Sequence, residues 1–294
     1  MITLYRPSGY DSPRASSFAG RSVDDKPLDV ENGSLFKEID TGRVFRYDKE
    51  NNIWIEQKST TGGTGATEPY IEETYDADGN LIEAKLYGYT KVRNYLFYKC
   101  TNLALTSLPE GLMSIGISAF SGCSNLALTS LPEGLTSIDG DAFGRCTNLA
   151  LTSLPEGLTS IGGNAFSGCS SLALTSLPEG LMSIGEYTFS GCSSLALTSL
   201  PESLTSIDGD AFDDCTSLAL TSLPDGLKYI RNFAFFGCTS LTSITFKGTP
   251  TTIGRLAFDG CTNLTDIKVP WAEGAVANAP WGATNATITY NYTE

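Results

Sequence analysis

The eight cysteines of this 294-residue chain follow one another at a constant interval of 23 residues. They are Cys100, Cys123, Cys146, Cys169, Cys192, Cys215, Cys238 and Cys261. Phenylalanine keeps the same interval from Phe120 to Phe258, and isoleucine keeps it from Ile115 to Ile253. A fixed period of this length is typical of a solenoid, because one repeat cannot bury its own apolar face whereas stacked repeats form a continuous core.

One repeat has the consensus C-x-x-L-A-L-T-S-L-P-E-G-L-T-S-I-x-x-x-A-F-x-x. Its LTSL and LTSI segments predict short strands in parallel ladders with the neighbouring coils. The Pro-Glu-Gly between them indicates a turn, because proline restricts φ and glycine accepts positive φ. The Ala-Phe-x-x-Cys segment is too short for a regular helix and predicts one helical or 3₁₀ turn. The expected fold class is therefore a β-rich repeat solenoid with short parallel strands and short helical turns in each 23-residue coil.

The pattern L-x-x-I-G-x-x-A-F-x-x-C-x-x-L, which extends roughly from Leu81 to Ile267, resembles the BspA-like, Treponema pallidum-type branch of bacterial leucine-rich repeats. The resemblance implies a leucine-rich-repeat solenoid, a role in adhesion or recognition, and no catalytic residues.

The chain departs from that family at the sixth residue after each cysteine. The family usually has a β-branched apolar residue there, whereas six repeats here have threonine, preceded by leucine. This leucine column is Leu105, Leu128, Leu151, Leu174, Leu197 and Leu220. If the threonines keep the inward position, alternation turns the leucines outward as an apolar stripe, and Leu128, Leu151, Leu174 and Leu197 become candidate recognition residues. The alternative is a local bulge that turns the leucines into the core, and the sequence leaves both open.

Residues 1–57 are expected to form a small all-β module, with an irregular arm up to residue 30 and a three-stranded meander at 34–57. Thr41-Gly42 and residues 49–52 mark the turns of this meander. The further predicted parts are a flexible Gly/Thr-rich linker at 58–69, an amino-terminal cap hairpin at 70–99, the solenoid at 100–263 and a carboxy-terminal cap at 264–294.

Two terminal segments, DDKPLDVENGSLFKEIDTGRVFRYD and VPWAEGAVANAPWGATNATITYNY, are similar to parts of structural proteins of tailed phages and prophages of Firmicutes. This resemblance implies a virion-associated protein whose amino-terminal module contacts phage structural proteins. The first thirty residues contain charged side chains and no apolar run, so we expect no signal peptide, a cytoplasmic location until release, and then a place on the virion or an extracellular surface. No stretch is long and apolar enough to predict membrane insertion.

The chain carries 19 basic and 33 acidic residues, which gives a net charge of −14. Residues 100–226 contain thirteen acidic residues and a single basic one, Arg145. Such an acidic surface argues against nucleic acid as a partner. The chain also has no histidine, so a Ser-His or Cys-His pair is impossible, and identical carboxylates provide no contrast between an acid and a base. We therefore expect no enzyme.

Six acidic residues follow the repeated proline and form the carboxylate column: Glu110, Glu133, Glu156, Glu179, Glu202 and Asp225. The column favours solubility or recognition, with Glu133, Glu156, Glu179 and Glu202 as candidate recognition residues. Calcium is the alternative, because it takes about six to eight oxygen ligands and Asp139, Asp141, Asp208 and Asp210 could add to them. The cysteines are expected to pack as small apolar thiols, since neither a C-x-x-C pair nor a histidine is present. No cofactor is predicted.

Aromatic residues interrupt the repeats at Tyr187, Tyr229, Phe233 and Phe236. Aromatic side chains anchor interfaces, so these four are further candidate recognition residues, unless they pack against the carboxy-terminal cap. The predicted function is non-catalytic recognition or adhesion by a virion-associated protein that binds a protein or glycan on a bacterial surface. The alternatives are a purely structural virion component and a bacterial cell-surface adhesin.

Overall fold

A computed structural model of the chain describes residues 69–293, apart from the side chain of Tyr70, together with the backbone of five earlier strands. Those strands are β1 (Thr3–Tyr5), β2 (Ser17–Gly20), β3 (Leu35–Glu38), β4 (Val44–Asp48) and β5 (Ile53–Glu56). The chain divides into two compact units, Met1–Tyr89 and Thr90–Glu294.

The first unit contains one seven-stranded sheet with the order β5-β4-β3-β2-β1-β6-β7. Strands β3, β4 and β5 are consecutive antiparallel neighbours, which confirms the three-stranded meander. The expectation of an irregular arm was wrong in part, because β1 and β2 lie within it and β2 pairs in parallel with β3. The turn signals at 41–42 and 49–52, and nearly all of the predicted linker, lie outside the described residues.

Strands β6 (Tyr70–Tyr75) and β7 (Leu81–Tyr87) form the predicted antiparallel hairpin. In its turn, the Asp76 carboxylate accepts hydrogen bonds from the amides of Asp78 (3.0 Å) and Asn80 (2.8 Å), as short acidic side chains often do. The free edge of β6 pairs with β1, so the hairpin belongs to the sheet of the first unit. The boundary therefore falls at residues 89–90, whereas the predicted cap hairpin extended to residue 99.

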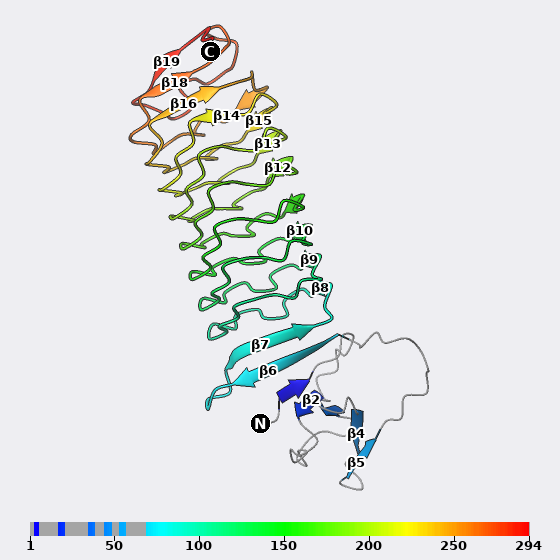
Figure 1. Cartoon of the computed structure of the whole chain (residues 1–294). Helices are drawn as coiled ribbons and strands as arrows, with labels where there is room; N and C mark the ends of the chain where they lie inside the picture. The colour runs from blue at the N-terminus through cyan, green and yellow to red at the C-terminus, as the bar shows by residue number, and fades with distance from the viewer. Residues whose placement is uncertain are drawn as a thin grey trace. The chain divides into compact units, whose positions relative to one another are not determined.

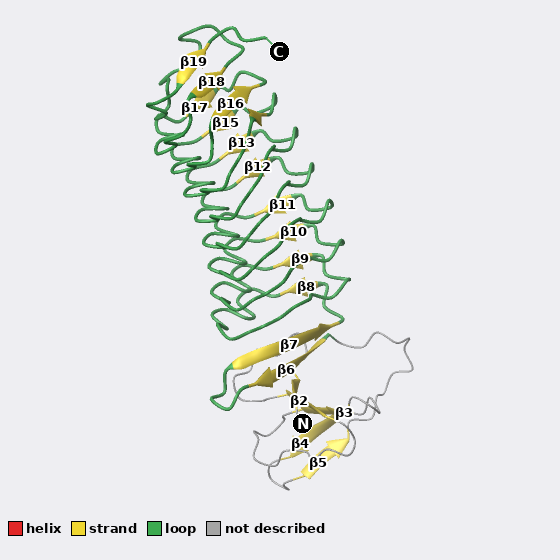
Figure 2. Cartoon of the chain, turned by 60° about the vertical axis from the view of Figure 1, so that its left-hand side comes forward, coloured by secondary structure: helices red, strands yellow, loops and turns green. Residues whose placement is uncertain are grey.

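The second unit is a solenoid whose successive coils stack along one axis (Figure 1). The LTSI segment and its equivalents form two-residue strands, as predicted. One parallel sheet contains β8 (Lys91–Val92), β9 (Ser114–Ile115), β10 (Ser137–Ile138) and β11 (Ser160–Ile161). A second contains β12 (Ser183–Ile184), β13 (Ser206–Ile207), β15 (Tyr229–Ile230) and β17 (Thr252–Ile253). Figure 2 shows these strands in a row with long loops between them.

The LTSL segment forms strands only near the carboxy-terminal end. These strands form the third sheet of the solenoid, which consists of β14 (Ser222–Leu223), β16 (Ser243–Phe246), β18 (Asp266–Lys268) and β19 (Thr287–Thr289). In earlier coils the predicted strand is absent. Leu128 and Leu131 are both buried there, while Thr129 and Ser130 between them are exposed, so the alternation of a strand is broken.

The leucine column is therefore buried, and its assignment as an exposed recognition stripe was wrong. Leu128, Leu151, Leu174 and Leu197 are each 0% exposed. Two consecutive residues after the leucine, such as Thr129 and Ser130, face outward. This extra outward residue is the local bulge that was the predicted alternative, and it directs each leucine into the core. In the coil of β16, Ile244 and Phe246 face inward two residues apart, so that segment remains a regular strand.

The Ala-Phe-x-x-Cys segment is not helical. None of the described residues forms a helix, so none of them belongs to a helix that could cross a membrane. Overlapping four-residue turns replace the predicted helical turn: the Ser121 amide bonds to Ser118 O (3.2 Å) and the Cys123 amide to Phe120 O (2.9 Å). Ser118 (φ 50°) and Gly122 (φ 78°) adopt left-handed conformations, which interrupt a helix. Their amides instead donate hydrogen bonds to the next coil.

The core of the solenoid contains a column of parallel phenylalanine rings. From Phe97 to Phe258, the centroids of consecutive rings lie 5.1 to 5.6 Å apart. Beyond the last coil, Trp271 and Trp281 are buried and lie edge-on or tilted against Phe246. The Trp281 indole donates a hydrogen bond to Ala277 O (2.7 Å), which orients its ring.

Candidate recognition surface

The cysteine column consists of core thiols, with the half-buried Cys100 at its amino-terminal end. Seven thiols are buried and Cys100 is half-buried, and none of the eight, which all lie among the described residues, forms a disulfide. From Cys123 onward, each thiol donates a hydrogen bond to a phenylalanine carbonyl of the preceding coil, for example Cys169 Sγ to Phe143 O (3.0 Å). Burial raises the pKa of the Cys123 and Cys261 thiols to about 12, so they remain protonated at neutral pH. The thiols pack as small, hydrogen-bonded core groups.

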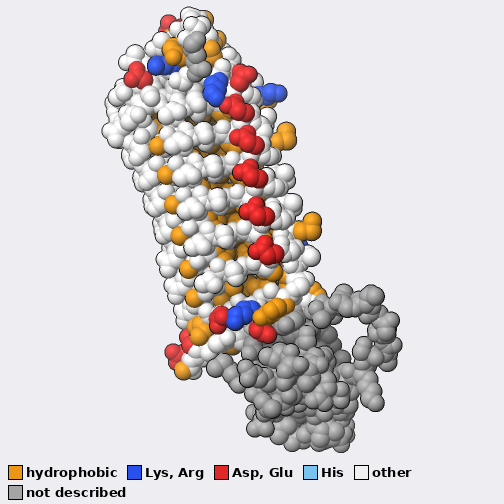
Figure 3. All heavy atoms as spheres, viewed as in Figure 1, with side chains coloured by type: hydrophobic (Ala, Val, Ile, Leu, Met, Phe, Trp, Pro, Cys, Tyr) orange, Lys and Arg blue, Asp and Glu red, His pale blue; other side chains and the backbone are white. Residues whose placement is uncertain are grey.

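The carboxylate column is exposed along one face of the solenoid, as Figure 3 shows. Glu133, Glu156, Glu179 and Glu202 each follow a buried Leu-Pro pair, so the chain reverses at the turn and the glutamate points into solvent. At the carboxy-terminal end of the column, Lys247 Nζ lies 2.5 Å from Glu202 Oε1. Among the described residues, no group of three or more His, Cys, Asp or Glu side chains could hold a metal ion.

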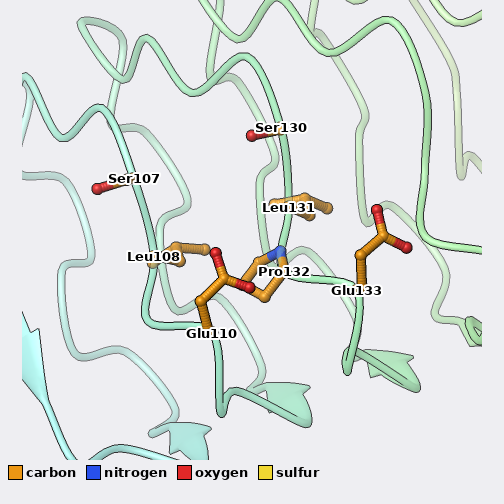
Figure 4. A pocket seen from close by; sticks show the side chains of 7 residues that line it. All are labelled: Ser107, Leu108, Glu110, Ser130, Leu131, Pro132 and Glu133. Atoms are coloured by element: carbon orange, nitrogen blue, oxygen red, sulfur yellow. The ribbon is translucent and has the colours of Figure 1, made fainter.

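A shallow groove of about 200 Å³ lies between the first two members of this column. It is lined by Ser107, Leu108, Glu110, Ser130, Leu131, Pro132 and Glu133. In Figure 4 the Glu110 carboxylate extends toward the next coil, and the two glutamates lie apart. The volume is below the roughly 300–1,000 Å³ of typical small-molecule sites, so the groove has room for one side chain or sugar ring rather than a cofactor.

The aromatic candidates lie in the turns that precede the cysteines or beside them. Tyr229 is exposed, and the Arg231 guanidinium lies 5.5 Å from its ring centroid. Phe233 and Phe236 are half-buried and meet edge to face, with centroids 5.9 Å apart. Tyr187 is exposed, and the charge of Asp210 raises the pKa of its hydroxyl, which therefore remains a hydrogen-bond donor.

A second aromatic pair, formed by Tyr95 and Tyr98, was not among the predicted recognition residues. These side chains are 58% and 44% exposed and meet edge to face at 5.9 Å. They had been assigned to the cap hairpin, whereas the structure places them in the first coil of the solenoid. Their spacing was the available signal, because Tyr95 and Tyr98 precede Cys100 by the same five and two residues as Phe233 and Phe236 precede Cys238.

The coils, their buried ladders and their exposed columns define a leucine-rich-repeat solenoid that presents side chains from a regular scaffold. Residues 90–219 and 182–274 match the model of the BspA type leucine rich repeat region, in six copies, and the chain belongs to this family.

Solved structures of bacterial leucine-rich-repeat proteins are similar to the chain. A leucine rich cell surface protein from Faecalibacterium prausnitzii is 22% identical, with a TM-score of 0.51 over 83% of this chain and 71% of that chain. A T. pallidum leucine rich repeat protein is 26% identical, with a TM-score of 0.44 over 66% of this chain and 87% of that chain. A Bacteroides ovatus leucine-rich repeat protein is 21% identical, with a TM-score of 0.41 over 77% of each chain. No curated protein matches the chain.

Proposed function

We propose that this chain is a non-catalytic recognition and adhesion protein whose solenoid binds a protein or glycan on a bacterial surface. The observation that carries the proposal is the exposure of Tyr95, Tyr98 and Tyr187 on a solenoid whose core is complete without them. Four other repeats have a small polar residue at the position of Tyr95 and Tyr187, namely Ser118, Asp141, Asn164 and Asp210. Large exposed aromatic side chains that folding does not require are typical of binding surfaces.

The amino-terminal module attaches this solenoid to a virion in our proposal. The support is the resemblance of residues 24–48 and of the carboxy-terminal segment to phage structural proteins. The F. prausnitzii neighbour is described as a cell surface protein, which agrees with display on a surface. Whether a virion or a cell surface displays the solenoid, its exposed side chains contact the partner. The carboxylate column keeps the repetitive surface soluble.

Binding to whole cells tests the proposal. The full chain, labelled at its amino terminus, is titrated onto a panel of Firmicutes strains with calcium and with a chelator. Saturable binding to some strains and not to others is the expected result. Absence of binding to every strain would contradict recognition and would favour a purely structural virion component.

The same titration tests calcium and the carboxylate column. If the column holds calcium, the chelator should lower binding, and the combined change Glu133→Gln, Glu156→Gln and Glu179→Gln should remove this dependence. Equal binding with calcium and with the chelator would exclude calcium from recognition.

A further inference from the structure

One repeat position, five residues before each cysteine, has a left-handed backbone in seven consecutive coils. Its occupants are Tyr95 (φ 58°), Ser118 (50°), Asp141 (56°), Asn164 (58°), Tyr187 (55°), Asp210 (54°) and Phe233 (59°). Asparagine and aspartate tolerate this conformation, whereas a bulky side chain is strained in it. Three of the seven residues are nevertheless aromatic. Folding alone therefore does not account for them, and strained residues of this kind concentrate at functional sites.

These aromatic residues lie on one line along the solenoid. The Tyr95 amide bonds to Ile117 O of the next coil (2.9 Å), and the Tyr187 amide bonds to Gly209 O (3.1 Å), so equivalent positions stay in register. Neighbouring coils are about 5 Å apart, so Tyr187 is about 20 Å from Tyr95 and about 10 Å from Phe233 along the axis. We call Tyr95, Tyr98, Tyr187, Phe233 and Phe236 the aromatic line.

Both ends of the aromatic line have the same edge-to-face pair. Tyr95 and Tyr98 meet at an interplanar angle of 86°, and Phe233 and Phe236 meet at 73°, each pair with a centroid distance of 5.9 Å. Exposed Ile117 extends the apolar surface beside Tyr95. Each pair therefore presents a ring held in place by its neighbour, as a flat stacking surface requires.

Polar side chains fill the intervals of the aromatic line. Ser118, Asp141 and Asn164 lie between Tyr95 and Tyr187, and Asp210 lies between Tyr187 and Phe233. The Ser118 hydroxyl donates a hydrogen bond to Asp141 Oδ2 (3.1 Å), and Asp141 retains further acceptor capacity. The line thus spans seven coils, in which hydrogen-bonding groups separate the aromatic rings.

We propose that the aromatic line binds a linear, neutral, hydroxyl-rich polysaccharide laid along the solenoid axis. A sugar ring presents a C–H face that stacks on an aromatic ring and hydroxyls that bond to carboxylates and amides. A protein partner would need a contiguous apolar centre, which rings separated by two and four coils do not form. Asp141, Asp210 and Asp213 would repel an anionic polymer. This inference rests on the proposed recognition function and names its ligand class.

The first experiment measures retardation of the full chain in native gels that contain hydroxyethylcellulose, xylan, galactomannan, yeast mannan or dextran. The test variant combines Tyr95→Asn, Tyr187→Asn and Phe233→Asn, which removes three rings and introduces the residue found at Asn164. We expect at least one polymer to retard the native chain and the variant to bind it at least tenfold more weakly, without a lower melting temperature.

The matched control combines Met113→Thr and Met182→Thr. These two exposed side chains lie in a different column, where Thr136 and Thr159 occupy the same repeat position. The control should be retarded as strongly as the native chain. Equal retardation of the native chain and the asparagine variant, or loss of retardation in the methionine control, would overturn the assignment to the aromatic line.

The second experiment separates this inference from the proposed function. Cells that bind the chain are treated with periodate, which oxidises vicinal diols, or with protease. Loss of binding after periodate alone supports a glycan ligand. Loss after protease alone, with no retardation in any gel, would overturn the polysaccharide while the recognition function stands. Retardation without binding to any cell would contradict cell recognition and leave the ligand class intact, whereas failure of both measurements would overturn both.

Discussion

The thiol of Cys146 donates a hydrogen bond to the carbonyl oxygen of Phe120 in the preceding coil, with Sγ and O 3.1 Å apart. The same bond recurs from Cys123 to Cys261, so the cysteine column is a hydrogen-bonded ladder beside the stacked phenylalanine rings. Two consequences follow, for alkaline stability and for thiol reactivity.

The free energy of unfolding should fall as the pH rises above 9. Burial raises the pKa of Cys123 from 9.0 to about 12, and it also raises the pKa of the neighbouring buried thiols. Between these values the unfolded chain releases protons that the folded chain retains, so each such thiol lowers stability by about 1.4 kcal/mol per pH unit. Urea unfolding at pH 8, 9 and 10 measures this slope, and Cys146→Ser with Cys169→Ser should reduce it. A flat profile would contradict buried, protonated thiols.

Only Cys100 should react with a thiol reagent in the folded chain at pH 8. The thiolate is the reactive species, and the other seven thiols are buried. Mass spectrometry after brief iodoacetamide treatment should show alkylation at Cys100 alone, and all eight thiols should react in urea. Rapid alkylation of Cys169 in the folded chain would show that the column opens.

Truncation of a leucine in the leucine column should be far more costly than truncation of the threonine beside it. Leu151 is fully buried, so Leu151→Ala should lower the free energy of unfolding by about 2–5 kcal/mol. Thr152 is exposed, so Thr152→Ala should change it by less than about 0.5 kcal/mol. Urea titrations of the two variants compare them directly, and the reverse ranking would place the threonines inside.

Two glycines in one coil should differ in their tolerance of alanine. A Cβ at Gly162 would lie 2.5 Å from Gly140 N in the preceding coil, so Gly162→Ala must separate the coils and should cost about 1–3 kcal/mol. A Cβ at Gly157 would have its nearest neighbour at 3.7 Å, so Gly157→Ala should be neutral or slightly stabilising. Equal melting temperatures would contradict the close approach of the two coils.

Salt should stabilise the folded chain through the carboxylate column. Exposed glutamates about one coil apart repel one another, and salt screens that repulsion. The melting temperature should therefore rise between 10 mM and 200 mM sodium chloride. The combined change Glu156→Gln and Glu179→Gln should raise the melting temperature at low salt and weaken its salt dependence, whereas Met182→Thr should leave the dependence unchanged.

The periodicity of the sequence determined the solenoid, its 23-residue coil and the inward cysteine, phenylalanine and isoleucine columns. These features follow from the sequence because each is a repeated local pattern, and only stacking can bury it. The exposed carboxylate column followed in the same way from the Pro-Glu-Gly turn.

Only the tertiary structure decided which way Leu151 and Thr152 face, because closure of the whole coil sets which positions point inward. One extra outward residue in the coil reverses the alternation of inward and outward side chains. It also decided that the Ala-Phe-x-x-Cys segment forms overlapping turns, since every second amide there, such as those of Ser118 and Gly122, bonds to the next coil instead of within a helix. Pairing between β1 and β6 is likewise a contact between distant segments. The edge-to-face contact of Tyr95 with Tyr98 is a further feature of the folded coil, because the spacing before Cys100 indicates the two positions but not the orientation of their rings.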